Sequence, residues 1–195
     1  MSSCYHRFFS KLSGPPIFAC VVKAAAFIWK IQAPSKSIFF GWRLIHDRLA
    51  TKDHLYKKGI LDISESNCVF CSEEEERLAP LLGGCLAVKP IWLKVFDWLG
   101  CISYFSLVDF IIFPYISDKV HSTAKRKIIG AIWLATCWHI WLIWNAINFK
   151  DGKFSFLDCM SKIIFSSWKW LCSSSKIAKN CNFHVWHISP LTCFE

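Results

Sequence analysis

The sequence predicts a mostly α-helical protein, and two observations carry that prediction. Apolar residues recur at three- and four-residue steps in several segments, which is the spacing of one face of a helix. Hydrophobic residues make up 54% of the 195 residues, with 11 Trp and 17 Phe, so the chain can fill a substantial core. Three cysteines lie between helical segments, at Cys68, Cys71 and Cys85. We therefore expect a small helical domain around these cysteines, of the zinc-knuckle kind, followed by a Trp-rich helical region.

Apolar stripes, capping residues and following glycines place the individual helices. Ser35 is the expected N-cap of the first, and its predicted buried face contains Ile38, Trp42, Ile45 and Leu49. Further helices are predicted at 51–58, 88–99, 123–148 and 156–172, and 104–116 is also interpreted as helix. The predicted divisions are a poorly ordered lead-in at 1–27, a cysteine-containing domain at 28–100, a Trp-rich helical region at 101–172 and a flexible tail at 173–195.

Positive charge is concentrated in the N-terminal third of the chain. The net charge is +9, and residues 1–60 hold ten Lys and Arg against two Asp, whereas the other 135 residues hold 13 against 12. Such a basic segment favours attraction to phosphate backbones or to acidic lipid. The simpler alternative is that these side chains are ordinary solvated helix faces.

The cysteines indicate a reducing compartment. Their number is 11, which is odd, and no clear secretory signal precedes them, because Lys23 interrupts the apolar run at 17–28. We expect Cys20, Cys137 and Cys159 to serve as small core residues. A nuclear or cytoplasmic location is favoured, with a membrane location as the alternative.

One uncharged stretch, 128–149, is long enough to cross a membrane. Its Trp residues occupy the middle and the C-terminal half, whereas Trp in spanning helices gathers at the headgroup level. Polar Thr136, His139 and Asn145 would need partners in lipid. We favour a buried bundle helix and keep a span at 128–147 as the alternative.

The spacing of Cys68, Cys71 and Cys85 is typical of zinc ligands. Two cysteines separated by two residues hold one side of a tetrahedron, and a later turn supplies the other side. Cys85 follows Cys71 after 13 residues, which suits a ligand from that later turn. A C-x-x-C pair also arises by chance in Cys-rich chains or serves redox chemistry, although no thioredoxin-like strand precedes this one.

The flanking residues carry a resemblance to a known family. Trp29-Lys30, Ala33-Pro34-Ser35-Lys36, Phe39 to Leu44, Arg48 to Lys52, Leu55 and Gly59-Ile60 precede the cysteines, and Trp92 follows them. In this order they resemble the zinc-binding domain that lies C-terminal to the reverse transcriptase in plant non-LTR (LINE-type) retrotransposons. The resemblance covers about residues 28–100. It implies a degenerate stand-alone copy without polymerase or nuclease residues, and therefore no enzyme.

The resemblance also implies a Cys-Cys-His-Cys zinc site. Cys68, Cys71 and Cys85 match its three cysteines, but Pro80 stands where the histidine belongs, and proline has no donor atom for a metal. Zinc is therefore the expected cofactor with three of four ligands present, and the site is expected to be weakened. Glu76, His54 and Cys101 are the candidates for a replacement ligand. Glu73 to Glu76 are otherwise interpreted as a solvated loop.

Nucleic acid is the expected partner, as RNA or DNA beside a polymerase in the relatives. The candidate phosphate contacts are Lys30, Lys36, Arg43, Arg48 and Lys52, with Trp29 or Trp42 available for stacking if exposed. The simpler interpretation of both tryptophans is core packing. A membrane-associated helical protein and a non-functional remnant are the alternatives to a nucleic-acid-binding module.

Overall fold

The computed structural model describes residues 17–60, 67–73, 76, 78, 80–100, 122–174 and 181–194. Within these ranges the protein is mostly helical, as predicted. The predicted helix at 104–116 and the candidate ligand Cys101 lie outside the described residues. The helices are α2 (Ile17–Ile28), α3 (Ser35–Ile45), α4 (Lys52–Lys57), α5 (Lys89–Trp98), α7 (Thr123–Lys150), α8 (Phe156–Ser174) and α9 (Phe183–Ile188), with a π-helical turn η2 (Pro80–Gly84) and a 3-10 helix η5 (Pro190–Phe194).

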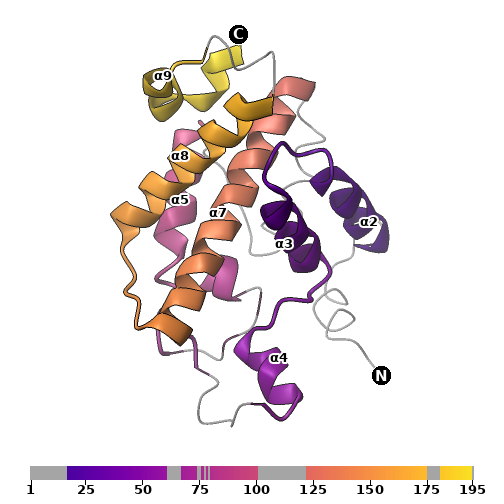
Figure 1. The fold of residues 1–195 in the computed structure, drawn as a ribbon, viewed down its shortest axis with the longest axis vertical. Helices are drawn as coiled ribbons and strands as arrows, with labels where there is room; N and C mark the ends of the chain where they lie inside the picture. Colours follow the sequence, from indigo (N-terminus) through magenta and orange to yellow (C-terminus); the bar gives the residue numbers. More distant parts are fainter. Residues whose placement is uncertain are drawn as a thin grey trace.

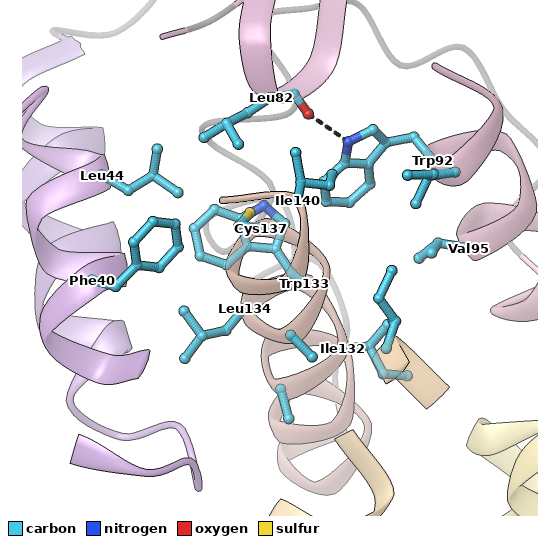
Figure 2. Close-up of a cluster of buried hydrophobic side chains, with 14 of the residues drawn as sticks. Phe40, Leu44, Leu82, Trp92, Val95, Ile132, Trp133, Leu134, Cys137 and Ile140 are labelled. Atoms are coloured by element: carbon cyan, nitrogen blue, oxygen red, sulfur yellow. Dashed lines mark hydrogen bonds between the residues drawn. The ribbon is translucent and has the colours of Figure 1, made fainter. Parts of the chain in front are cut away.

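The long helix α7 is the centre of the fold. Figure 1 shows α3 and α2 on one side of it, with α8 and α5 on the other. Trp133 and Leu134 of α7 are fully buried, and the side chains around them come from α3, η2 and α5 (Figure 2). The indole Nε1 of Trp92 donates to the carbonyl of Leu82 at 2.6 Å, which joins α5 to η2 within this core. One cluster of buried side chains therefore includes residues from both the cysteine-containing part and the Trp-rich part.

The uncharged stretch in α7 is a core helix in this structure. By length and composition α7 is the one described helix that could cross a membrane, with a mean hydropathy of 1.4 over its best 18-residue window. However, 72% of that window is buried inside the protein. Trp133, Cys137, Ile140 and Trp144, which recur at three- and four-residue steps, are each at most 1% exposed. This burial supports the bundle interpretation.

The buried face of α3 differs from the predicted one. Ile45 and Leu49 are buried as expected, but Ile38 and Trp42 are only half-buried, and Phe40 and Leu44 point into the core instead. The reason is the close approach of α3 to its neighbours, because a Cβ added at Gly41 would lie 2.7 Å from Leu134 Cδ1 of α7 and 3.1 Å from Ile28 Cδ1 of α2. The N-cap is Pro34, so Ser35 is the first helical residue and the predicted start is wrong by one position.

Both ends of the chain contain more helix than we expected. Residues 17–27 of the expected lead-in lie in α2, where Val21, Ala24 and Ile28 are buried, and residues 1–16 lie outside the described residues. The expected flexible tail contains α9 and η5, and a disulfide joins Cys181 to Cys193. That disulfide does not fit the predicted reducing compartment, whereas Cys137 and Cys159 are free and fully buried, as predicted.

Trp186 joins the C-terminal segment to α5 and α8. It is 1% exposed, its carbonyl accepts from the Trp98 indole at 3.0 Å, and its own Nε1 donates to the Ile164 carbonyl at 3.1 Å.

The remaining helices agree closely with prediction. In α5, the predicted residues Ile91, Trp92 and Val95 are buried, and Gly100 follows with a φ of 67°, a left-handed conformation that glycine adopts without strain.

Candidate metal centre

Two backbone turns bring Cys68, Cys71 and Cys85 together. Their sulfur atoms all lie within 4.8 Å of one another, and Sγ of Cys68 is 3.8 Å from Sγ of Cys85. The first turn is closed by the N–H of Ser72, which donates to the Cys68 carbonyl at 2.8 Å. The second is closed by the N–H of Lys89, which donates to the Cys85 carbonyl at 2.9 Å at the start of α5. The chain thus places the three predicted ligands where one ion could contact all of them.

Backbone N–H groups point at two of the three sulfur atoms. Those of Phe70 and Cys71 donate to the Cys68 sulfur, and those of Ala87 and Val88 donate to the Cys85 sulfur. Burial nevertheless raises the pKa of Cys68 to about 12 and raises the pKa of Cys85, and the N–H groups offset only part of that effect. A bound cation reverses this balance, because a coordinating thiol is deprotonated. Three sulfurs, two of them buried and supplied with N–H donors, therefore fit one face of a tetrahedral zinc site.

No fourth ligand joins the three cysteines among the described residues. Pro80, where the resemblance places the histidine, begins η2 and carries no donor atom. The imidazole of His54 is engaged elsewhere, with Nδ1 2.6 Å from the Leu49 carbonyl oxygen. Neither His54 nor Glu76 belongs to the thiol cluster, so both replacement ligands predicted from these residues are wrong. The donor set in the described part of the chain is three thiols.

Glu76 has a structural role that the sequence did not reveal. It is 1% exposed, so the prediction of a solvated acidic loop is wrong for this residue, whereas Glu73 is exposed. Its Oε1 accepts from the backbone N–H of Lys52 at 2.9 Å, and its Oε2 accepts from Nε1 of Trp144 at 2.7 Å. Burial raises the pKa of the Glu76 carboxyl, and these donors and the Val69 N–H act in the opposite direction. One carboxylate thus connects the first cysteine turn, the start of α4 and the core helix α7.

The predicted phosphate-contacting residues lie between the end of α2 and the start of α4, but their surroundings differ. Lys30 and Lys36 are exposed. Arg43 is exposed as well, yet its guanidinium donates to the Arg48 carbonyl at 2.9 and 3.2 Å. The Arg48 guanidinium lies 5.4 Å from the centre of the Trp42 ring, and Lys52 Nζ donates to the Asn67 carbonyl at 3.0 Å. Three of the five candidates, Arg43, Arg48 and Lys52, therefore also make contacts within the protein.

Trp29 is exposed rather than part of the core. It is 51% exposed and meets Phe39, which is 57% exposed, edge to face with ring centroids 5.5 Å apart. Trp42 is half-buried under Arg48. The core interpretation is thus wrong for Trp29, and the condition set for stacking is met there. The sequence could not show this because Trp29 lies at the end of α2, where no periodic pattern distinguishes an inward from an outward position.

Helices around a cluster of cysteine thiols define the class of this protein as a small helical domain with a zinc-type site. Residues 1–92 match the family model described as zinc-binding in reverse transcriptase. This part of the chain is therefore similar to the zinc-binding domain of reverse transcriptases, which confirms the resemblance predicted from the landmarks around the cysteines. The match ends at Trp92, so α7, α8 and α9 lie beyond it. No curated protein and no solved structure matches the chain.

Proposed function

We propose that this chain is a non-catalytic module, derived from a plant non-LTR retrotransposon, that binds single-stranded RNA or DNA and holds zinc with reduced affinity. The observation that carries the nucleic-acid part is the exposed Trp29–Phe39 pair beside Lys30 and Lys36. Aromatic rings accept stacked bases, and neighbouring cations attract the phosphates that connect those bases.

The charge around this pair supports the same partner. Residues 17–46, which include α2 and α3, contain no Asp or Glu, so nothing acidic within them opposes a phosphate chain. An acidic protein partner would use the same cations, but it would have no need of two exposed aromatic rings set between them. Burial of α7 supports this module over a membrane-spanning protein.

The zinc part of the proposal follows from the donor count. Three thiolates leave one position of the tetrahedron to water, so the ion is held by fewer bonds than in a Cys-Cys-His-Cys site. A structural zinc site and its local fold form together, so a lost ligand weakens both. A copy that has drifted in sequence would carry such a site.

Filter binding of a labelled single-stranded oligonucleotide at several salt concentrations tests the nucleic-acid proposal. We expect log K to fall linearly with log salt concentration, and Trp29→Ala to weaken binding by about 1–3 kcal/mol. Phe165→Ala is the matched control, because Phe165 is 48% exposed on α8 and lies next to Lys169. An affinity that does not change with salt concentration, or equal losses of affinity in the two variants, would contradict the proposal. The alternative that the protein is a non-functional remnant would then be favoured.

A further inference from the structure

A cavity of about 450 Å³ lies between α2 and the N-terminal end of α7. Seven of the described residues line it, and four of these are cationic: Lys23, Ala26, Phe27, Lys30, Thr123, Arg126 and Lys127. None of these seven described residues is acidic. Figure 1 shows α3 between α2 and α7, and Ile31, in the segment that leads from α2 into α3, approaches Gly130 of α7. This feature is distinct from the thiol cluster, because none of its lining residues belongs to the cysteine turns.

The geometry of the two helices keeps the cavity in place. A Cβ added at Gly130 would lie 2.8 Å from Cε1 of Phe27 and 3.2 Å from Cδ1 of Ile31, so glycine allows the end of α2 to rest directly on α7. Ile28 of α2 and Ile128 of α7, close to this crossing, are at most 1% exposed. Three of the four cations are therefore attached to two packed helices, and the fourth, Lys30, lies in the turn that directly follows α2.

The lining chemistry matches a nucleotide unit. Four cations around one space favour a ligand with negative charge, and the N-terminal end of α7 adds the positive end of its helix dipole. The first turn of α7 contains no acidic residue that would neutralise it. Phe27 and Ala26 supply an apolar wall for a base. Ligand cavities in proteins have volumes of about 300–1,000 Å³, and this one falls in that range.

We propose that this cavity binds one phosphate of a single-stranded nucleic acid together with the adjoining base. Lys30 lies at the cavity and directly follows Trp29, so the strand would run from the cavity onto the Trp29–Phe39 pair. A base in a duplex is paired and stacked and does not enter such a space. The inference rests on the proposed function and assigns a site to it that includes α7, beyond the residues matched by the family model.

Two variants of the full chain test the site through different properties. Lys23→Met with Lys127→Met removes two charges from the cavity, and Lys150→Met with Lys153→Met removes two charges from the other end of α7 and the segment that follows it. Ala26→Phe keeps every charge but fills the cavity, and Ala26 is exposed, so the fold should tolerate the change. The probe is a fluorescein-labelled 12-nucleotide single strand, compared with its duplex and with vesicles that contain phosphatidylserine.

We expect the cavity double variant to lose about tenfold in affinity for the single strand and to reduce the salt slope by about 1, while the matched control changes neither by as much. Ala26→Phe should weaken the single strand and leave the duplex unchanged. Equal losses in the two double variants, no effect of Ala26→Phe, or vesicle binding in place of oligonucleotide binding would overturn the cavity assignment. If the wild-type chain binds no oligonucleotide at all, the proposed function fails with it. If the wild type and the cavity variants bind the single strand equally well, only the cavity assignment is overturned.

Discussion

The thiol cluster and the core around α7 share one fold, but they are stabilised in different ways. At α7, Trp133 is fully buried among apolar side chains from α3, η2 and α5. At the cluster, three cysteine sulfurs, two of them buried, converge on a space in which the described residues place no other group that could bind a metal. The core is complete without any ion, whereas the cluster has the form of a metal site with three donors.

This difference indicates that zinc binding stabilises only the cysteine turns and not the whole fold. In a small zinc domain, binding of the ion supplies most of the folding free energy. In this chain the cysteine turns also rest on Leu81 and Leu82, which are fully buried, and on Glu76, which reaches α7. The larger core can therefore hold the cysteine turns together after a ligand is lost. The predictions below test that separation.

The largest effect is expected in the core. Trp133→Ala removes a fully buried indole and should lower the free energy of unfolding by about 3–5 kcal/mol, because a cavity is left behind. Denaturant unfolding measures this change with and without a chelator, and we expect the loss to be the same in both. Trp29→Ala is the control and should change stability by less than about 1 kcal/mol. A Trp133→Ala loss that depended on zinc would remove the separation between the two regions.

The next effect concerns pH and the contact between α7 and α8. Burial, helped by Lys162, lowers the pKa of His139 to about 4, and Asp158 acts in the opposite direction. Nε2 of His139 lies 2.8 Å from Oγ of Ser166. Since the folded state prefers the neutral ring, His139 stabilises the fold above its usual pKa of 6.5, and this contribution is lost as the pH falls toward 4.

The loss attributable to His139 should reach about 3 kcal/mol by pH 4. His139→Gln does not titrate, so its unfolding free energy should fall less between pH 7 and pH 4 than that of the wild type. His184→Gln, at an exposed position on α9, is the control and should follow the wild type. Parallel curves for His139→Gln and the wild type would contradict the burial of a neutral ring.

A smaller effect is expected at the connection between the two regions. Glu76→Ala leaves the Lys52 N–H and the Trp144 indole without their acceptor and should destabilise the protein by about 1–3 kcal/mol. Glu73→Ala, at an exposed position in the same acidic run, should have little effect. The difference between the two variants in thermal or denaturant unfolding is the measurement. If the two variants behave alike, the carboxylate does not connect the cysteine turns to the core.

The smallest effect is expected from the metal itself. Ligand binding stabilises a fold by RT ln(1 + [L]/Kd), so zinc at a concentration equal to its Kd contributes only about 0.4 kcal/mol. We expect chelation to shift global unfolding by less than about 1 kcal/mol. A shift of several kcal/mol would show that the cluster, rather than α7, is the main source of stability.

The sequence predicted the features that depend on local periodicity and spacing. The helices near 88–99, 123–148 and 156–172 appear with ends displaced by only one or two residues, because their apolar stripes are long. The convergence of Cys68, Cys71 and Cys85 also followed from spacing and family landmarks. These features are encoded in residues that lie close together in the sequence.

What the sequence did not predict depends on tertiary contacts. The burial of Glu76 depends on Trp144, which lies 68 residues away. The order of the tail depends on Trp186 meeting Trp98 across 88 residues. The rotation of the α3 face depends on the close approach at Gly41. None of these pairings leaves a local pattern, and the basic cavity is of the same kind because its two walls come from α2 and α7.

A zinc titration of the full chain, followed by competition with a chromophoric chelator, tests the central claim most directly. We expect the wild type to bind one zinc weakly and Pro80→His to bind it more than about 100-fold tighter, since even a partner outside the coordination shell is worth 10–100-fold in affinity. Cys68→Ser should abolish binding in both backgrounds. Binding by the wild type that matches Pro80→His in affinity and still depends on Cys68 would show that the site is complete without the histidine, and would contradict this account.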